Sequence, residues 1–416
     1  MSTIIEKILA AHSGREVVKP GEYVWADVDV TNGGGGQLEN LRKLGIKKLF
    51  NPDRIWVIDD HKAPPPDVES AESVARTRQF VKEYGITHWY EYGRHGILHQ
   101  RFPETGYVVP GDLIAMTDSH STTYGAFNAA GCPINVESIY VLIKGKLWFR
   151  VPPTIKFNLT GHLPKMTVGK DVILKIAGTY GTDVALYKSV EFLGPLAREM
   201  SLASRWTMSN MGIEIGAKCA IFEADEKTMG FLRGRITREP RPTSPDKDAK
   251  YERVIDVDVT DLEPMVALPH DPGNSVPVSK VEPKGIKINQ GFIGSCTNGR
   301  FEDLKMAADI LKGNKVHPDV RLIVSPNSVE VYRDALKAGL LDIFVEAEAL
   351  VCHPTCGPCM GSHMGILAAG ERCASTTNRN FQGRMGSPQS EVYLANAATV
   401  AASCIEGKIT DPRKYA

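Results

Sequence analysis

Three cysteines have the spacing and surroundings of ligands to a metal centre. They are Cys296 in Gly-Ser-Cys-Thr-Asn-Gly-Arg, and Cys356 and Cys359 in Cys-Gly-Pro-Cys. Glycine, proline and small polar residues surround them, and such residues are typical of loops at the ends of helices and strands. Three thiolates suit an iron–sulfur cluster that takes its fourth ligand from outside the protein. A cluster with one open iron is a Lewis acid, so the pattern indicates catalysis rather than electron transfer.

Two other thiol chemistries fit part of this pattern and stay open at the level of the sequence. Cys-Gly-Pro-Cys is also the redox dithiol of thioredoxin-like folds. That motif usually follows an aromatic residue early in a short domain, whereas here Thr355 precedes it near the end of a long chain. A tetrahedral zinc site could instead use the three cysteines together with Cys352.

Several segments carry groups suited to acid–base chemistry. Asp60 precedes His61, and a neighbouring carboxylate can raise the pKa of a histidine toward the working pH. A second imidazole, His99, follows Leu98, and the segment Thr117-Asp-Ser-His-Ser-Thr-Thr-Tyr124 places Asp118 and His120 in one loop. One such pair is common on a protein surface. Three of them in a chain with a cysteine triad favour a catalytic site.

Two arginines could recognise a carboxylate. Arg379 and Arg384 lie five positions apart in Thr377-Asn-Arg-Asn-Phe-Gln-Gly-Arg384. A guanidinium fork can donate two parallel charge-assisted hydrogen bonds to a carboxylate. The alternative is an ion pair with a carboxylate of the protein itself. Glu191, just before a Gly-Pro turn, would by itself be a solvated residue at the end of a strand.

The elements that must position these groups alternate between strands and helices. The sequence predicts a strand over 54–58 followed by a helix over 69–84, and a strand over 320–324 followed by a helix over 329–338 and a strand over 343–345. This alternation is typical of an α/β fold with largely parallel sheets. In such sheets, ligands bind at the carboxyl ends of the strands. Asp60 and Cys296 each follow a predicted strand, as this arrangement requires.

Two interruptions of the pattern divide the chain into three predicted domains. Val151-Pro-Pro153 and Val281-Glu-Pro-Lys-Gly285 give boundaries that separate residues 1–152, 153–284 and 285–416. Residues 237–250, rich in proline and charge, are expected to be an exposed loop of the middle domain. Gly33 to Gly36 leave the backbone free either to approach a ligand closely or to form a turn.

Composition excludes several classes of protein. The 416 residues contain 49 basic and 49 acidic side chains, so no net charge attracts nucleic acid or an anionic membrane. No stretch approaches the ~20 apolar residues of a membrane span. The N-terminus predicts an amphipathic helix rather than a secretion signal. Eight cysteines without such a signal indicate reduced thiols and a cytoplasmic location.

Together, these segments resemble the aconitase superfamily, in particular the large subunits of the 3-isopropylmalate dehydratase and homoaconitase type. The resemblance extends nearly from end to end. The residues that carry it are Asp60-His61, His99-Gln100, Pro110-Gly-Asp, Thr117-Asp-Ser-His120, Val190-Glu-Phe, Met208-Ser-Asn-Met211-Gly-Ile-Glu214-Ile-Gly-Ala, Asp261-Leu-Glu-Pro, Gly294-Ser-Cys-Thr-Asn-Gly-Arg300-Phe-Glu-Asp, Cys356-Gly-Pro-Cys359, Asn378-Arg-Asn-Phe, Gly383-Arg-Met-Gly-Ser-Pro and Ile409-Thr-Asp-Pro.

The resemblance implies three α/β/α layered domains around a central iron–sulfur cleft, without the fourth, swivelling domain of aconitase. It implies a [4Fe–4S] cluster on Cys296, Cys356 and Cys359, with one iron not bound by cysteine, and the dehydration of a small hydroxy-dicarboxylic acid. His61, oriented by Asp60, would give a proton to the departing hydroxyl. The remaining family positions fall into a catalytic set and a substrate-binding set: His99, Asp118, His120 and Glu191; and Ser119, Arg379 and Arg384.

The resemblance also implies a partner, because a separate small subunit supplies the swivelling domain in relatives of this length. Some aconitase relatives bind RNA when the cluster is lost, so a regulatory protein is a second hypothesis; a cluster-less or zinc-stabilised binding scaffold is a third. The chain departs from the family pattern at Thr31–Gly36, at Ala130–Asn135 and at Asn396-Ala397. Cys132 and Cys352 are additional thiols without a family role. These departures favour a smaller or methyl-substituted substrate, such as a malate derivative.

Overall fold

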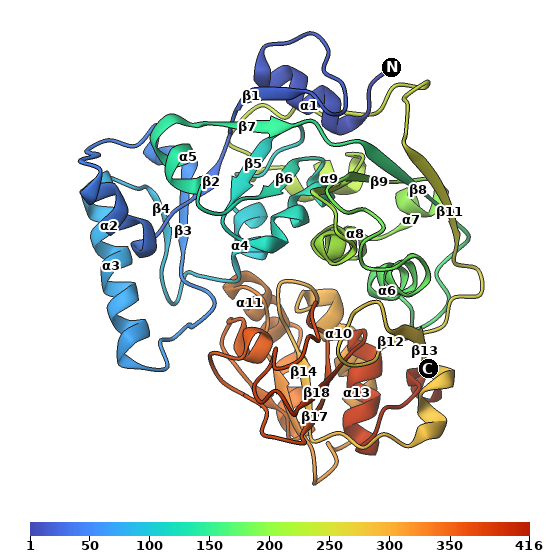
Figure 1. Cartoon of the computed structure of the whole chain (residues 1–416). Helices are drawn as coiled ribbons and strands as arrows, with labels where there is room; N and C mark the ends of the chain where they lie inside the picture. Colours follow the sequence, from blue (N-terminus) through green and yellow to red (C-terminus); the bar gives the residue numbers. More distant parts are fainter.

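The computed structural model describes all 416 residues, which form an α/β fold with five sheets. Figure 1 shows the N-terminal and middle parts together in the upper half of the molecule, with the C-terminal part below them. No helix is both long and apolar enough to cross a membrane.

The N-terminal part contains three small sheets. Strands β2 to β4 are parallel, β5 and β6 are parallel, and β1 pairs with β7 in antiparallel orientation. The strands are β1 (Tyr23–Asp27), β2 (Thr31–Asn32), β3 (Ile55–Ile58), β4 (His88–Tyr90), β5 (Leu113–Met116), β6 (Ala130–Pro133) and β7 (Lys146–Arg150). The helices are α1 (Ile4–Ser13), α2 (Gly35–Lys43), α3 (Val68–Tyr84), α4 (Leu98–Glu104) and α5 (Ser138–Lys144).

Two glycines of the run, Gly33 and Gly35, allow α2 and the residues just before it to pack closely on α3. A Cβ atom on Gly35 would lie 2.7 Å from the backbone nitrogen of Thr77 in α3, and one on Gly33 would lie 2.8 Å from the Phe80 ring. Because no other residue leaves this space, the glycines let the two helices approach closely.

The middle part has a single parallel sheet in the order β10-β9-β8-β11. Its strands are β8 (Thr154–Thr160), β9 (Ser189–Leu193), β10 (Cys219–Phe222) and β11 (Arg253–Asp258), and its helices are α6 (Gly169–Tyr180), α7 (Pro195–Glu199), α8 (Leu202–Asn210) and α9 (Glu226–Leu232). The predicted exposed loop, residues 237–250, has no helix or strand but is tied to the N-terminal part. Arg238 pairs with buried Asp112 at 2.6 Å, and Lys7 pairs with Asp246 at 2.6 Å.

The C-terminal part has a seven-stranded sheet in the order β13-β12-β18-β17-β14-β15-β16. Its strands are β12 (Met265–Ala267), β13 (Ser275–Pro277), β14 (Gln290–Ile293), β15 (Arg321–Val324), β16 (Leu350–Val351), β17 (Arg372–Ser375) and β18 (Glu391–Leu394). Its helices are α10 (Phe301–Leu311), α11 (Val329–Lys337), α12 (Leu340–Glu346) and α13 (Ala397–Glu406). Strands β12 and β13 precede residue 285, so this sheet begins before the predicted domain boundary.

One predicted element is wrong. Residues 343–345 lie inside helix α12 and not in a strand. Leu340, Leu341 and Phe344 are its buried residues, and this spacing of three and four belongs to a helix that presents one apolar face. The other four predicted elements are confirmed, with ends within one residue of those predicted. They are the strands β3 and β15 and the helices α3 and α11.

Candidate active site

The three cysteines meet in a buried pocket between the two halves of the molecule. Cys296 follows the end of β14. Cys359 lies in a short 3-10 turn at Gly357–Met360, and Cys356 directly precedes this turn as its N-cap. The thiols are only 6–7% exposed and pack with Ile97 into a small cluster of their own. The pocket is also lined by Asp60, His61, His99, Asp118, His120, Ser295, Met360, Asn378 and Arg384.

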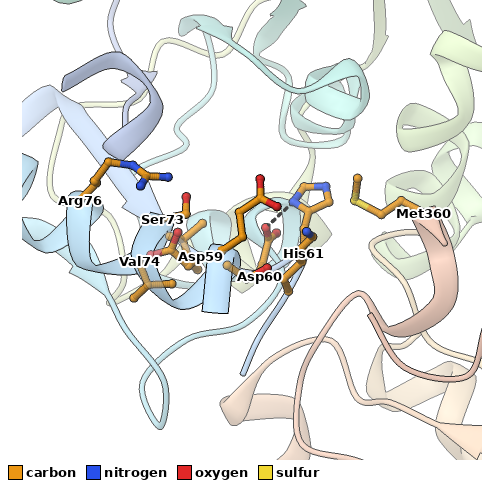
Figure 2. Close-up of a pocket in the computed structure, with 11 residues that line it drawn as sticks. Asp59, Asp60, His61, Ser73, Val74, Arg76 and Met360 are labelled. Atoms are coloured by element: carbon orange, nitrogen blue, oxygen red, sulfur yellow. Dashed lines mark ion pairs between the residues drawn. The ribbon is translucent and has the colours of Figure 1, made fainter. Parts of the chain in front are cut away.

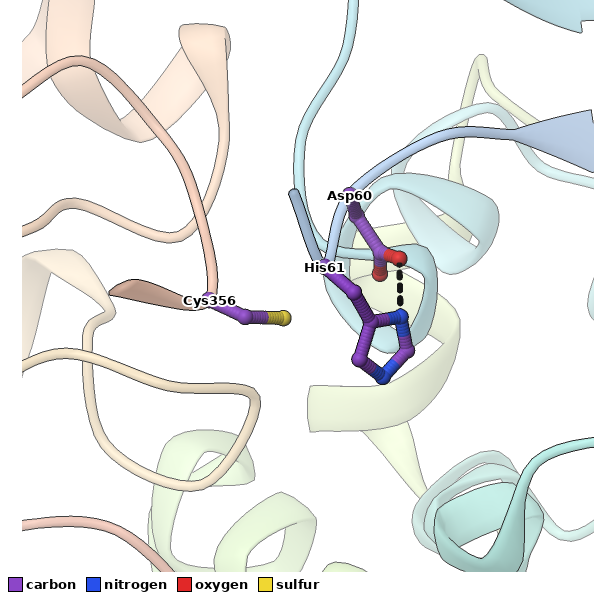
Figure 3. Close-up of side chains that lie close together, drawn as sticks. All are labelled: Asp60, His61 and Cys356. Carbon is purple, nitrogen blue, oxygen red and sulfur yellow. Dashed lines mark ion pairs between the residues drawn. The ribbon is translucent and has the colours of Figure 1, made fainter. Parts of the chain in front are cut away.

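The thiols fit a multi-iron cluster better than a single zinc ion. Four sulfurs around one zinc, with Zn–S bonds of about 2.3 Å, would lie roughly 4 Å apart. Only Asp60, His61 and Cys356 bring three metal-ligating atoms within 4.8 Å of one another in this chain (Figure 3). In that group, the His61 and Asp60 side chains already bond to each other. The three sulfurs of the triad are not all within 4.8 Å of one another, whereas ligands of one shared zinc ion would be.

The surroundings of the sulfurs also fit a cluster. Asn378 Nδ2 donates a hydrogen bond of 3.3 Å to Cys296 Sγ, and hydrogen bonds to sulfur help to set the properties of bound clusters. Burial raises the pKa of the Cys296 thiol to about 12, and a bound metal would favour its thiolate form. Cys352, which the zinc alternative requires, donates instead to the Leu350 carbonyl oxygen at 3.9 Å and does not line the pocket.

Asp60 and His61 form a fixed pair at the end of β3. His61 Nδ1 lies 2.8 Å from Asp60 Oδ1, and the other oxygen of Asp60 accepts a 2.7 Å hydrogen bond from the backbone nitrogen of Leu98. The negative charge of Asp60 raises the pKa of His61 to about 10, so this imidazole holds its proton at neutral pH. The His61 side chain is 47% exposed and faces the pocket with Nε2.

A second cavity opens on the outer side of His61. It has a volume of about 310 Å³ and is bounded on one side by α3. Figure 2 shows Ser73, Val74 and Arg76 of α3 across this space from His61 and Met360. Small molecules thus have room to approach the imidazole from the solvent.

Asp118 organises the two other histidines. Its Oδ1 lies 2.8 Å from His99 Nε2 and accepts a 2.8 Å hydrogen bond from the backbone nitrogen of His120. Burial opposes the ionisation of Asp118, but His99 and His120 together hold its pKa well below the usual value. His99 Nδ1 bonds to the hydroxyl of Tyr124 at 3.1 Å, which fixes the orientation of the ring.

Ser119 and Arg379 meet although 260 residues separate them in the chain. Arg379 Nη1 donates to Ser119 Oγ at 3.0 Å, and its Nε donates to Glu214 Oε1 at 2.8 Å. The alternative considered for the arginines, an ion pair with the protein, therefore applies to Arg379. Arg384 has no carboxylate partner; its Nε donates to the carbonyl oxygen of Cys359 at 2.9 Å.

Glu214 is the residue at this site to which the sequence assigned no role. Its Oε1 lies 3.0 Å from His120 Nε2 as well as 2.8 Å from Arg379 Nε. The only sequence signal was its place in the family-like segment Met208–Ala217. Neither of its partners is near it in the chain, so the contact could not be read from spacing.

The structure does not place Glu191 with the other predicted catalytic residues. It lies in the interior of β9, fully buried, and accepts hydrogen bonds from the backbone nitrogen of Ile4 at 2.6 Å and from the Tyr251 hydroxyl at 2.7 Å. Burial raises its pKa to about 7. Its contacts connect the middle sheet to the N-terminal helix, so its role here is structural.

Comparisons with known proteins agree with this site. The family model described as the Aconitase family (aconitate hydratase) matches residues 57–407. The chain belongs to the aconitase family. It is a hydro-lyase, as its relatives are.

This aconitase-family chain is similar along its whole length to curated proteins. It is 50% identical to "3-isopropylmalate dehydratase large subunit 1" of Methanopyrus kandleri and 51% identical to the protein of the same name from Pyrococcus abyssi, each over 99% of both chains. It is 49% identical to "3-isopropylmalate dehydratase large subunit" of Moorella thermoacetica over the same share. Among solved structures, Thermococcus kodakaraensis aconitase X shares the fold, with a TM-score of 0.50 at 15% identity over 91% of this chain and 89% of that one.

These findings confirm the predicted resemblance and the predicted α/β fold. They also decide among the classes of function considered from the sequence. The relatives are dehydratase subunits, which supports an enzyme and not the regulatory or scaffold alternative.

Proposed function

We propose that the chain is the cluster-binding large subunit of a [4Fe–4S] dehydratase that acts on a small hydroxy-dicarboxylic acid. The observation that carries this proposal is the convergence of Cys296, Cys356 and Cys359 with histidines and an arginine in one buried pocket. A cluster held by the three thiolates, with one iron not bound by cysteine, would supply the Lewis acidity that weakens the carbon–oxygen bond of the substrate.

His61 is the proposed proton donor to the departing hydroxyl. Hydroxide is a poor leaving group, and transfer of a proton to it as the bond breaks lowers the barrier. Three observations support this role: His61 lines the pocket beside the cysteines, a cavity reaches it from outside, and Asp60 Oδ1 orients the ring through Nδ1. Hydrogen bonds among His99, Asp118 and His120 fix these residues in place. They would bind the hydroxyl or water beside His61.

The carboxylates of the substrate are proposed to bind Ser119, Arg379 and Arg384. The Arg379 guanidinium is held at Nε by Glu214 and at one terminal nitrogen by Ser119, which leaves its other terminal nitrogen without a protein partner. Arg384 uses only Nε for its backbone contact, so both of its terminal nitrogens are available for a bidentate carboxylate. Two such cations suit a diacid better than a monoacid.

A separate small subunit is the proposed partner. The relatives matched over 99% of their length are named large subunits, and that name implies a second subunit. We infer that this partner closes the pocket and contributes the base that removes the α-proton. The large subunit alone is then expected to bind the cluster without turning over substrate.

The substrate is proposed to be smaller than 3-isopropylmalate, or to carry methyl groups in place of the isopropyl group. Asn32, in the segment that departs from the family pattern, exchanges hydrogen bonds of 2.9 and 3.0 Å with Thr117, directly before Asp118. The departure thus touches the loop that carries Asp118, Ser119 and His120. We infer that a change there acts on the substrate pocket through the position of this loop, two residues of which, Asp118 and His120, line the pocket of the cysteines.

The proposal is tested with anaerobically reconstituted protein together with its small subunit. The substrates are 3-isopropylmalate, malate, and malate with methyl groups at carbon 2, carbon 3 or both. We expect the complex to convert at least one methyl-substituted malate to the unsaturated diacid. Of all the acids tested, that methyl-substituted malate should have the highest kcat/KM. A complete, iron-loaded complex that dehydrates none of these acids would contradict the proposal.

A further inference from the structure

Lys170 is a completely buried lysine whose ammonium contacts only backbone oxygens. It lies in the first turn of α6, and none of its surface is exposed. Its Nζ donates hydrogen bonds to the carbonyl oxygens of Thr376 at 2.9 Å and Thr377 at 2.5 Å. No carboxylate lies within ion-pair distance of it in the structure.

This placement is unfavourable for both the charge and the helix. An ammonium buried without a counter-charge loses its hydration, and burial lowers the pKa of Lys170 to about 7. A positive charge in the first turn of a helix also opposes the helix dipole. A lysine in this place is not explained by the stability of α6, so its contribution lies in the two carbonyl groups that it binds.

The two carbonyl groups belong to the turn that enters the site. Thr377 immediately precedes Asn378, which donates to Cys296 Sγ, and Arg379, which donates to Ser119 and Glu214. Thr376 also binds the loop of Cys296 directly, because its hydroxyl lies 3.0 Å from the carbonyl oxygens of Gly294 and Asn298 on either side of that cysteine. One ammonium therefore anchors the backbone turn that directly precedes two polar residues of the site, Asn378 and Arg379.

We propose that Lys170 is a positioning residue for Arg379: its ammonium fixes the turn at Thr376 and Thr377 so that the guanidinium faces the substrate carboxylate. This inference rests on the proposed function, in which Arg379 binds that carboxylate. Lys170 itself touches neither Arg379 nor the pocket.

The test compares Lys170→Met with Lys175→Met in the complete, iron-loaded two-subunit enzyme. Methionine keeps the length and volume of the side chain but has no donor. Lys175 is the matched control, because it lies on the same helix and its Nζ also donates to a backbone carbonyl, that of Asp258 at 2.7 Å, but near the surface. We expect Lys170→Met to raise KM about tenfold or more, equivalent to about 1.4 kcal/mol, with a smaller change in kcat and an unchanged iron content.

A double-mutant cycle tests whether Lys170 acts through Arg379. In an Arg379→Gln background, Lys170→Met is expected to add little to the loss of kcat/KM, because the group that it positions is already absent. Additive losses, or a KM of Lys170→Met equal to that of Lys175→Met, would overturn the inference. A crystal structure of the Lys170→Met chain shows the position of Arg379 independently of any activity measurement. A guanidinium that still bonds to Ser119 and Glu214 in that structure would also overturn the inference.

Two further outcomes separate this inference from the proposed function. If Lys170→Met does not fold, Lys170→Gln takes its place, because the shorter amide keeps a neutral donor; we expect an intermediate rise in KM, and the wild-type KM would overturn the inference. A wild-type complex without activity on any diacid counts against the proposed function. The crystallographic comparison then still decides whether Lys170 holds Arg379 in place.

Discussion

Glu214 and Arg379 form an ion pair next to the pocket-lining His120, with Arg379 Nε 2.8 Å from Glu214 Oε1. The same carboxylate oxygen lies 3.0 Å from His120 Nε2. One oxygen atom thus orients a proposed substrate-binding cation and a proposed catalytic imidazole. Both side chains of the pair are largely buried, so water competes weakly for these bonds.

Glu214→Gln is expected to lower kcat/KM about 100-fold. Glutamine keeps the shape, but it is neutral and one of its two polar atoms is a donor, so it cannot hold both partners equally well. Displacement of binding and catalytic groups by small distances has effects of this size on rate. Steady-state kinetics with the substrate preferred by the wild-type complex measures it. The control is Glu226→Gln on α9, an exposed carboxylate for which we expect no change; an unchanged rate for Glu214→Gln would show that the pair is not needed.

His61→Gln is expected to lower kcat by roughly 10²- to 10⁴-fold while KM changes little, because a general acid acts in the transition state. Asp60→Asn should cause a smaller loss, since it removes the orientation of the imidazole and not the imidazole itself. The matched control is His162→Gln: His162 also pairs with a carboxylate, that of Glu199 at 2.6 Å, but on the surface. Retention of wild-type kcat by His61→Gln would remove this residue from the mechanism.

Three of the predicted site residues directly follow strands. Asp60 comes after β3, Asp118 after β5 and Cys296 after β14. A strand of apolar residues followed by a polar loop is visible in a short stretch of sequence. Parallel strands direct their carboxyl ends toward one edge of a sheet. However, β3, β5 and β14 lie in three different sheets, so the sequence predicted each loop but not how the three sheets bring them together.

The features of the site that could not be predicted from the sequence depend on contacts between segments far apart in the chain. Glu214 meets His120 across 94 positions, and Lys170 meets Thr376 across 206. The buried position of Glu191, away from the other predicted catalytic residues, could not be predicted for the same reason. Its partner Ile4 is 187 positions away, and nothing near Glu191 in the sequence marks the carboxylate as buried. The secondary structure of the three apolar residues 343–345 could not be decided from their neighbours, because a short apolar run fits either a strand or one face of a helix.

Cys359→Ser is expected to abolish stable cluster binding, whereas Cys352→Ser should leave it intact. A serine hydroxyl is a poor ligand for iron, and two remaining thiolates do not hold a four-iron cluster firmly. Cys352 is the control because it is a nearby thiol outside the pocket. Iron and sulfide content per chain, with the visible absorption spectrum after anaerobic reconstitution, measures the difference. Loss of iron from Cys352→Ser with retention in Cys359→Ser would reverse the ligand assignment.

Glu191 predicts a pH dependence of stability that is separate from catalysis. Burial raises its pKa to about 7, above the value of about 4.3 for an exposed glutamate, so the folded chain keeps the proton over a range in which the unfolded chain loses it. The contribution of the protonated carboxyl is complete below about pH 4 and is lost as the pH rises to 7.

Glu191→Gln removes this titration but keeps a neutral side chain of similar shape beside Ile4 and Tyr251. Between pH 4.5 and 8, the free energy of unfolding of the wild type is therefore expected to fall by about 3 kcal/mol relative to the variant. Urea unfolding of both chains in the same cluster state, at several pH values across this range, measures the difference. The absolute stability of the variant does not matter, because any constant loss from the amide cancels. Parallel curves would mean that Glu191 is ionised in the folded chain, and its hydrogen bonds from Ile4 and Tyr251 would then stabilise a carboxylate.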